Sequence, residues 1–192
     1  MVASCLVACA SSGCAGAIDY DYSKEFDPRK YEYVIGASDG LEITVWRNGE
    51  LNTRATVRPD GTITMPLIGD LKVAGRTPSQ VRDEISAKLA EFVKSEAVVT
   101  VAVTGVNSYR FTVTGNVANP GTFNSQYYVS VADALAMAGG PSRFADTHAI
   151  QVIRTTKDGK MRRIPVSYAD IQTRARPEAN IIVVAGDVIY VP

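Results

Sequence analysis

The fold of this chain is decided by residues 57–69, which read VRPDGTITMPLIG. Two strand-like stretches, residues 53–57 and 62–67, flank a four-residue segment that contains Asp60 and Gly61. An Asp-Gly pair between two such runs is typical of a β-hairpin, because glycine adopts a positive φ without steric cost. We therefore predict a hairpin here, within a module that consists largely of strands.

Upstream of this hairpin the sequence predicts two further strands. Apolar and polar residues alternate over residues 31–35 and again over residues 41–45, which is the period of a half-buried strand. Asn48 and Gly49 mark the turn that follows the second run. The first module is therefore expected to be rich in antiparallel strands from about Tyr31 onward.

Downstream, one segment has the pattern of an amphipathic helix that runs from Pro78 to about Lys94. Thr77 is a good N-cap, proline suits the first helical position, and Gln80 can complete a capping box. The apolar positions at helical spacing are Val81, Ile85, Leu89, Phe92 and Val93. Residues 97–104 are rich in β-branched side chains and predict a buried strand after the helix.

A second module is predicted from about Val106. Its expected strands cover residues 111–117, 150–156, 161–166 and 188–191. Ser130 can cap a short helix through Met137, which a Gly-Gly-Pro sequence then ends. A second Asp-Gly turn, at Asp158, joins two of the strands. Four or five strands around one short helix indicate a small β-grasp fold, so the predicted fold class of the chain is α+β.

The composition argues against several kinds of site. Twenty Lys and Arg residues balance twenty Asp and Glu residues, and nucleic-acid binders usually show a basic excess, so no nucleic-acid partner is expected. The small basic cluster is interpreted as a solvated hairpin: Lys157, Lys160, Arg162 and Arg163. The single histidine, His148, is interpreted as a surface residue, and no cysteine follows Cys14. We therefore expect no disulfide or thiolate zinc site after Cys14, and no cofactor.

The first residues have the character of a targeting signal. Residues 1–16 are small, apolar and cysteine-bearing, and the segment that ends at Cys9 (Leu-Val-Ala-Cys) has the form of a lipobox. We predict lipid attachment at Cys9, with Cys5 and Cys14 as weaker alternatives. No Lys or Arg precedes Cys9, so the true start can lie upstream. Ala10, which follows Cys9 where an aspartate would favour the inner membrane, makes the signal similar to those of outer-membrane lipoproteins.

Taken together, these segments resemble the bacterial polysaccharide export protein family. The matching segments, in order, are residues 33–36 with Asp39, 57–63, 65–69, 73–77, 113–117, 119–121, 138–140 and 186–192. Ser38 departs from the family, which usually has glycine before the aspartate. The resemblance implies three parts: a lipoprotein signal remnant and linker at 1–30, a polysaccharide export domain at 31–105, and a soluble-ligand-binding β-grasp domain at 106–192.

The resemblance implies a non-catalytic lipoprotein, anchored in the outer membrane and facing the periplasm, that helps to export capsular polysaccharide or exopolysaccharide. Family members assemble into homo-oligomeric rings and dock on an inner-membrane co-polymerase of the chain-length-regulator type. Residues 53–57, 97–104 and 188–191 could leave strand edges for a ring neighbour. Longer relatives add further β-grasp copies and a membrane-crossing C-terminal helix. This sequence shows neither before Pro192, so a separate outer-membrane β-barrel is the expected partner.

Two other functions are compatible with parts of the sequence. Paired carboxylates could cleave glycosides, and the candidates are Asp39, Asp60, Asp70, Asp158 and Asp187. Most of them lie in turns or at the starts of strands, where backbone requirements explain an aspartate. β-grasp domains also occur in proteins that bind cobalamin-like compounds, although the fused first module argues against a small-ligand binder.

Overall fold

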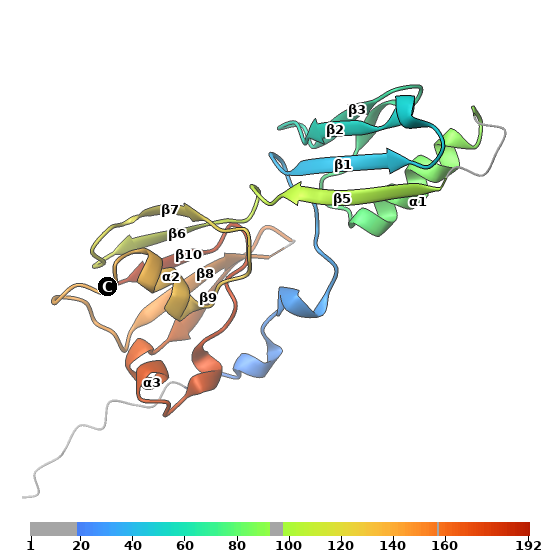
Figure 1. Cartoon of the computed structure of the whole chain (residues 1–192). Coiled ribbons are helices and arrows are strands. Elements are labelled where there is room, and N and C mark those ends of the chain that lie inside the picture. Colours follow the sequence, from blue (N-terminus) through green and yellow to red (C-terminus); the bar gives the residue numbers. More distant parts are fainter. Residues whose placement is uncertain (1–18, 93–97, 157) are drawn as a thin grey trace, which may run out of the picture.

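The computed structural model describes residues 19–92, 98–156 and 158–192. Figure 1 shows two lobes, which are joined by the chain that leads out of the first lobe and by the N-terminal segment. Each lobe has its own cluster of buried apolar side chains, one centred on residues such as Ile43 and Val81 and the other on residues such as Phe111 and Ile164. The described chain therefore forms two lobes, each with its own core.

The first lobe contains two small sheets and one helix. Its strands are β1 (Gly40–Val45), β2 (Thr53–Thr56), β3 (Thr62–Met65), β4 (Gly69–Lys72) and β5 (Val99–Gly105). One antiparallel sheet has the order β2-β1-β5, and β3 pairs with β4 in the other. Helix α1 (Pro78–Leu89) has both bonds of the predicted capping box and buries Val81, Ile85 and Leu89. A 3₁₀ turn, η3 (Gly49–Leu51), lies between β1 and β2.

The predicted hairpin at Asp60 is wrong in its strand pairing. The turn itself forms, because the Arg58 amide donates to the Thr62 carbonyl (2.9 Å) and Gly61 has a φ of 80°. However, β2 pairs with β1 while β3 pairs with β4, so the chain changes sheets at this turn. The hairpin that does form turns through Leu67 (φ 65°) and places Met65 opposite the first residue of β4.

Two further predictions in the first lobe are corrected. Residues 31–35 form no strand: the segment is held by two backbone bonds, from Ile35 N to Arg76 O (2.9 Å) and from Gly75 N to Ile35 O (2.8 Å). Helix α1 ends at Leu89, so Phe92 lies beyond it and is 56% exposed. Val93 and Lys94, the other predicted end of the helix, lie outside the described residues.

The second lobe is a five-stranded mixed sheet in the order β7-β6-β10-β8-β9. The strands are β6 (Arg110–Gly115), β7 (Gly121–Asn124), β8 (Ile150–Thr155), β9 (Met161–Val166) and β10 (Val188–Val191). The helices are α2 (Val131–Met137) and α3 (Tyr168–Gln172), with a 3₁₀ turn η4 (Pro177–Ala179). Strands β6 and β10 are parallel, and the predicted β8–β9 hairpin is confirmed. The closing strand β10 is central, so the prediction of a free edge there is wrong. The predicted edges at β2 and β5 are confirmed, and β7 and β9 are the edges of the second sheet.

Residues 19–30, which we call the N-terminal strap, differ from the free linker expected from the sequence. Asp21 and Asp27 cap two 3₁₀ turns, η1 (Tyr22–Lys24) and η2 (Pro28–Lys30). Tyr22 is only 6% exposed, belongs to the core of the second lobe, and donates its hydroxyl hydrogen to the Pro165 carbonyl (2.7 Å). The strap therefore packs on the second lobe before the chain enters the first, as the blue segment of Figure 1 shows.

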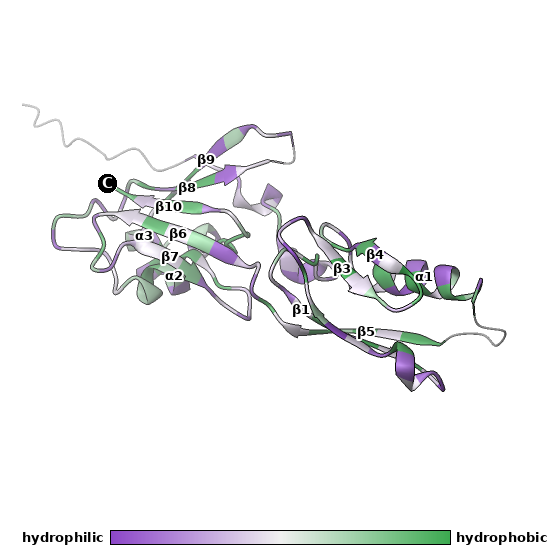
Figure 2. Cartoon of the chain, turned by 90° about the horizontal axis from the view of Figure 1, so that it is seen from above, coloured by the Kyte–Doolittle hydropathy of each residue, from purple (hydrophilic) through white to green (hydrophobic). Residues whose placement is uncertain are grey.

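Hydropathy follows this architecture. Figure 2 shows hydrophilic and hydrophobic residues alternating along α1, as expected for a helix with one buried face. Within the described part of the chain, no helix is both long enough and apolar enough to cross a membrane.

Candidate functional site between the two lobes

The joint between the lobes is organised around the carboxylate of Asp39, which is fully buried at the start of β1. Oδ1 accepts hydrogen bonds from the backbone amides of Asn107 and Ser108, both at 2.8 Å. Oδ2 accepts from the Gly36 amide (2.8 Å), the Ser108 hydroxyl (2.9 Å) and the Tyr33 hydroxyl (2.6 Å). One carboxylate thus ties the approach to β1 to the connector between β5 and β6, where the chain enters the second lobe.

The residues around Asp39 are matched to this role. Burial, followed by the hydrogen bond to Asp39, raises the pKa of the Tyr33 hydroxyl, so this group remains a donor at neutral pH. A Cβ added at Gly36 would collide with the Cβ and Oγ of Ser108, so only glycine fits there. Ser38, which stands where the family usually has glycine, adopts a left-handed φ of 74° and donates its amide to Val57 O (2.8 Å).

An aromatic cleft opens beside this joint. Its principal lining residues are Phe26, Tyr31, Tyr33, Tyr109, Tyr128 and Val184, and we call it the tyrosine cleft. The rings of Phe26 and Tyr31 stack with their centroids 5.2 Å apart and are 50% and 64% exposed. The rings of Tyr109 and Tyr128 meet edge-to-face at 5.4 Å. The strap, the β5–β6 connector and the loop before β10 all contribute to this cleft, so it exists only in the folded chain.

The polar groups of the tyrosine cleft are few. The Tyr109 hydroxyl is engaged, because it donates to Val183 O (2.8 Å) and accepts from Val129 N (3.2 Å). Among the described residues, the hydroxyls of Tyr31 and Tyr128 have no hydrogen-bond partner. Burial raises the pKa of the Tyr128 hydroxyl. The cleft therefore presents ring surfaces and neutral hydroxyls.

One carboxylate, that of Glu32, is the only charged group among the described residues that line the tyrosine cleft. It accepts a hydrogen bond from the Ser79 amide (2.9 Å), and this bond lowers its pKa.

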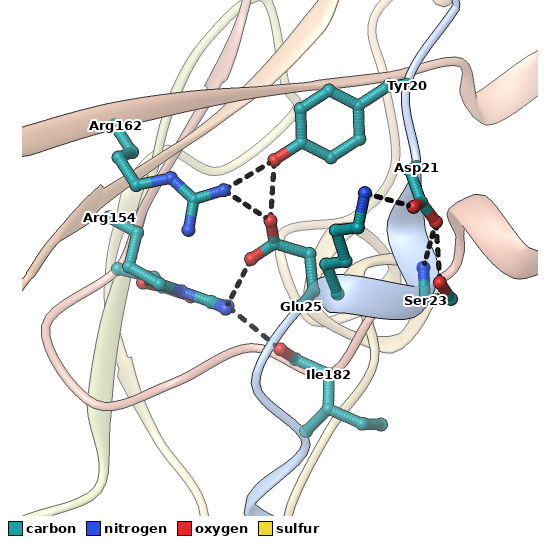
Figure 3. A network of polar contacts seen from close by, with 9 residues as sticks. Tyr20, Asp21, Ser23, Glu25, Arg154, Arg162 and Ile182 are labelled. Carbon is teal, nitrogen blue, oxygen red and sulfur yellow. Dashed lines mark hydrogen bonds and ion pairs between the residues drawn. The ribbon is translucent and has the colours of Figure 1, made fainter.

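A buried ionic network fastens the strap to the second lobe (Figure 3). The Glu25 side chain is 4% exposed, and its carboxylate lies 3.3 Å from Arg154 and 2.7 Å from Arg162. Arg154 also binds Asp187 (2.7 Å), so it is shared by two carboxylates. The Tyr20 hydroxyl donates to Glu25 (2.5 Å). Arg162 is exposed on the β8–β9 hairpin, as the interpretation of a solvated hairpin expects, but it also pairs with the buried Glu25.

Comparison with known proteins gives the family. The model described as polysaccharide biosynthesis/export protein matches residues 27–104, and the SLBB domain model matches residues 110–165. The chain carries a polysaccharide biosynthesis/export domain followed by an SLBB domain. The resemblance inferred from the motifs and the α+β fold class are thereby confirmed. The export-domain match begins inside the strap.

The relatives are named for polysaccharide export or transport. The chain is 31% identical to EPS I polysaccharide export outer membrane protein EpsA of Ralstonia nicotianae, over 83% of this chain and 47% of that protein. It is 27% identical to capsule polysaccharide export protein BexD of Haemophilus influenzae, over 83% of this chain and 43% of that protein. It is 28% identical to polysialic acid transport protein KpsD of Escherichia coli, over 57% of this chain and 20% of that protein. The chain thus spans about half the length of the first two relatives and less of the third.

The five candidate carboxylates do not converge on one site. Asp39 lies at the joint, Asp187 binds Arg154, and Asp158 is exposed in the β8–β9 turn. Asp60 and Asp70 do come together, but on either side of Arg58, at 3.5 Å and 2.9 Å.

Hydrogen bonds lower the pKa of both carboxyls of that pair. For Asp60 the main donor is Thr62, and for Asp70 the main donor is Arg58. A glycosidase acid needs a raised pKa, so this pair is better suited to bracing the β3–β4 hairpin.

The remaining site predictions concern the N-terminal cysteines, a metal site and His148. Cys9, the predicted lipid attachment site, lies outside the described residues, as do Cys5 and Cys14. Over the described ranges, no group of three potential metal ligands is present. His148, expected to be an isolated surface residue, is exposed but has one contact, between Nδ1 and the Ser167 hydroxyl (3.3 Å).

Sequence reasoning missed the strap network and the tyrosine cleft. The one available signal was the alternation of Tyr20 and Tyr22 with acidic residues, which is a pattern of one-sided burial.

Proposed function

We propose that this chain is part of the conduit through which capsular polysaccharide or exopolysaccharide crosses the outer membrane. The observation that carries the proposal is the order of an export domain and an SLBB domain, matched over residues 27–104 and 110–165. Relatives that align with most of this chain are named for export of exopolysaccharide or capsule. The proposed cargo is therefore a polysaccharide, in transit rather than as a substrate for chemistry.

A non-catalytic role is part of the proposal. Its support is that four of the five candidate carboxylates are engaged: Asp39 accepts five hydrogen bonds, Asp187 binds Arg154, and Asp60 and Asp70 share Arg58. Incubating the protein with the host's own polysaccharide should release no new reducing ends. Hydrolysis that is lost in a protein with Asp60→Asn and Asp70→Asn would contradict this part.

The proposed location is the periplasmic face of the outer membrane, with a lipid on Cys9 as the anchor. The docked strap supports this arrangement, because an anchor near the N-terminus would then pull on the second lobe and not on a loose linker. The proposed partners are copies of the same chain in a ring, the inner-membrane co-polymerase, and the separate outer-membrane component expected from the sequence. The sheet edges at β2 and β5 are candidate contacts between copies.

Deletion of the gene in the host tests the function. Surface polysaccharide should disappear, and polymer should accumulate on the periplasmic side of the outer membrane. The wild-type gene should restore export. A matched complementation with the Asp158→Asn variant, which changes an exposed turn residue, should also restore it. Unchanged surface polysaccharide in the deletion strain would overturn the proposal.

A further inference from the structure

We propose that the tyrosine cleft is a contact site for an uncharged pyranose ring of the exported glycan. The inference rests on the proposed export function and assigns the side chains that touch the cargo. The carbon–hydrogen faces of a pyranose are apolar and its rim carries hydroxyls, so a protein site for it needs exposed aromatic faces with neutral polar groups beside them. The cleft offers both.

The stacking surface comes from Phe26 and Tyr31. Their rings lie nearly parallel, at an interplanar angle of 18°, and half or more of each side chain is exposed. The core of either lobe does not account for them, because neither ring belongs to one of the two buried clusters. Exposed aromatic rings gathered in a concave place are typical of a binding site and not of a solvated surface.

The neutral hydroxyls are those of Tyr31 and Tyr128. Neither has a hydrogen-bond partner among the described residues, and Tyr128 is partly buried. A phenol both donates and accepts, so it can pair with a sugar hydroxyl in either sense. The cleft has a volume of about 140 Å³, below the range of sites that enclose a drug-sized ligand, so it suits contact with a single sugar ring and not enclosure of a longer segment.

The charge of the lining favours a neutral ligand. Glu32, the one charged lining residue, is already bound to the Ser79 amide. No cation lines the described cleft, so an anionic sugar or a phosphate gains nothing there. The site also lies where the strap, the β5–β6 connector and the loop before β10 meet, so a bound ring would contact both lobes. With one stacking platform, binding is expected to be weak, on the order of a millimolar Kd. Weak binding suits a cargo that must move on.

The test uses the full chain and oligosaccharides released by partial hydrolysis of the host's own surface polysaccharide. Aromatic NMR resonances of Phe26, Tyr31 and Tyr128 should shift on titration. Phe26→Ala should raise the Kd about fivefold or more, and Tyr128→Phe, which removes only a hydroxyl, should raise it about two- to fivefold. Phe144→Ala is the matched control, since Phe144 is an exposed ring outside the cleft, and its Kd should equal that of wild type.

Three results would overturn the assignment. The first is a set of oligosaccharide-induced shifts at other residues, or none at all, in the wild-type protein, a result that does not depend on whether any variant folds. The second is equal affinity for Phe26→Ala and Phe144→Ala proteins. The third is cleft resonances that respond to dilution of the protein but not to glycan, which would make the cleft a contact between copies. None of these results alters the export phenotype of the deletion strain, so failure here and failure of the proposed function are distinguishable.

Discussion

Asp39 shows how one residue can hold two distant parts of the chain. A buried carboxylate is tolerated only when its oxygens are hydrogen-bonded, and five donors meet this one. Two of the donors are backbone amides of the β5–β6 connector, 68 and 69 residues away. From the sequence, Asp39 was explained by the local backbone needs of a strand entry. That explanation covers the hydrogen bond from the Gly36 amide but not the bonds from the β5–β6 connector.

Replacing Asp39 with asparagine should therefore be costly. Three of the five donors are backbone amides, which cannot accept, so in either orientation the new amide nitrogen would face at least one of them and leave it unpaired. We expect the free energy of unfolding to fall by about 3 kcal/mol, measured by urea denaturation. Asp158→Asn is the control, because Asn-Gly suits the exposed β8–β9 turn as well as Asp-Gly does. Equal stability of the two variants would show that the joint does not depend on the charge.

Gly36 offers a second residue-scale prediction. An alanine there would push against the Ser108 side chain, which is fixed by its own bonds to Asp39. Overpacking of this kind destabilises by about 1–3 kcal/mol, so we expect a lower thermal midpoint for Gly36→Ala. Gly49→Ala should leave the midpoint nearly unchanged, because nothing lies within 4 Å of its added Cβ. A Gly36→Ala protein as stable as the Gly49→Ala protein would contradict the crowding argument.

At the scale of elements, the sequence predicted best where the determinants are local. Helix α1 begins where predicted because Thr77 and Gln80 bond each other's backbone within one turn. The turn at Asp60 was predicted for the same reason, but its strand partners were not. Strand β3 pairs with β4 through a turn in which Leu67 has a positive φ, and leucine gives no signal of that conformation.

The strap and the tyrosine cleft lay beyond local patterns. Glu25 reaches Arg154 across 129 residues of sequence, and one amino-acid sequence read alone does not show such a pairing. The cleft is assembled from residues as far apart as Phe26 and Val184. Each residue alone reads as an ordinary surface aromatic or loop residue, so only the folded arrangement shows the site.

Neutralising Glu25 should loosen the strap without unfolding the lobes. The side chains of Glu25 and Arg154 are almost fully buried, whereas that of Arg162 is half exposed and contributes less. Arg154 stays paired with Asp187 in this variant, so it loses only one of its two ion pairs. We expect amides of residues 20–30 in Glu25→Gln protein to exchange about tenfold faster, which corresponds to about 1.4 kcal/mol. Glu50→Gln, at an exposed position, should leave that exchange rate unchanged.

Across the whole molecule, the chain crosses between the lobes twice. The strap leaves the second lobe for the first near Tyr31, and the β5–β6 connector returns beside it, as Figure 1 shows. Both crossings meet at Asp39. A pull on the proposed lipid anchor at Cys9 would therefore reach the second lobe through Tyr22 and Glu25, and then the joint, without passing through the first lobe.

The anchor itself is tested by mass spectrometry of protein isolated from host membranes. A lipid on Cys9 would make a diacylglyceryl cysteine the N-terminal residue of the mature chain. A Cys9→Ser variant should leave the membrane fraction, whereas Cys14→Ser should remain in it. A mature N-terminus beyond Cys14 without lipid would contradict the prediction.

Assembly into a ring is the prediction that depends on the molecule as a unit. In the first lobe, β2 and β5 leave both sides of a three-stranded sheet unpaired among the described strands. Joining β2 of one copy to β5 of the next would satisfy both edges, and a head-to-tail contact of this kind closes into a ring when its rotation allows. Strand β10, central in its sheet, takes no part.

Cysteines at Thr56 and Ala102, both exposed on these edge strands, test the contact in a chain that has no other cysteine after Cys14. In cells that make polysaccharide, the Thr56→Cys, Ala102→Cys protein should give a ladder of discrete multiples under oxidation, and each single variant should give none. Cysteines at Thr122 and Met161, on the β7 and β9 edges of the second lobe, are the matched control. A ladder from the control pair alone would move the contact to the second lobe, and monomer in every case would count against a ring.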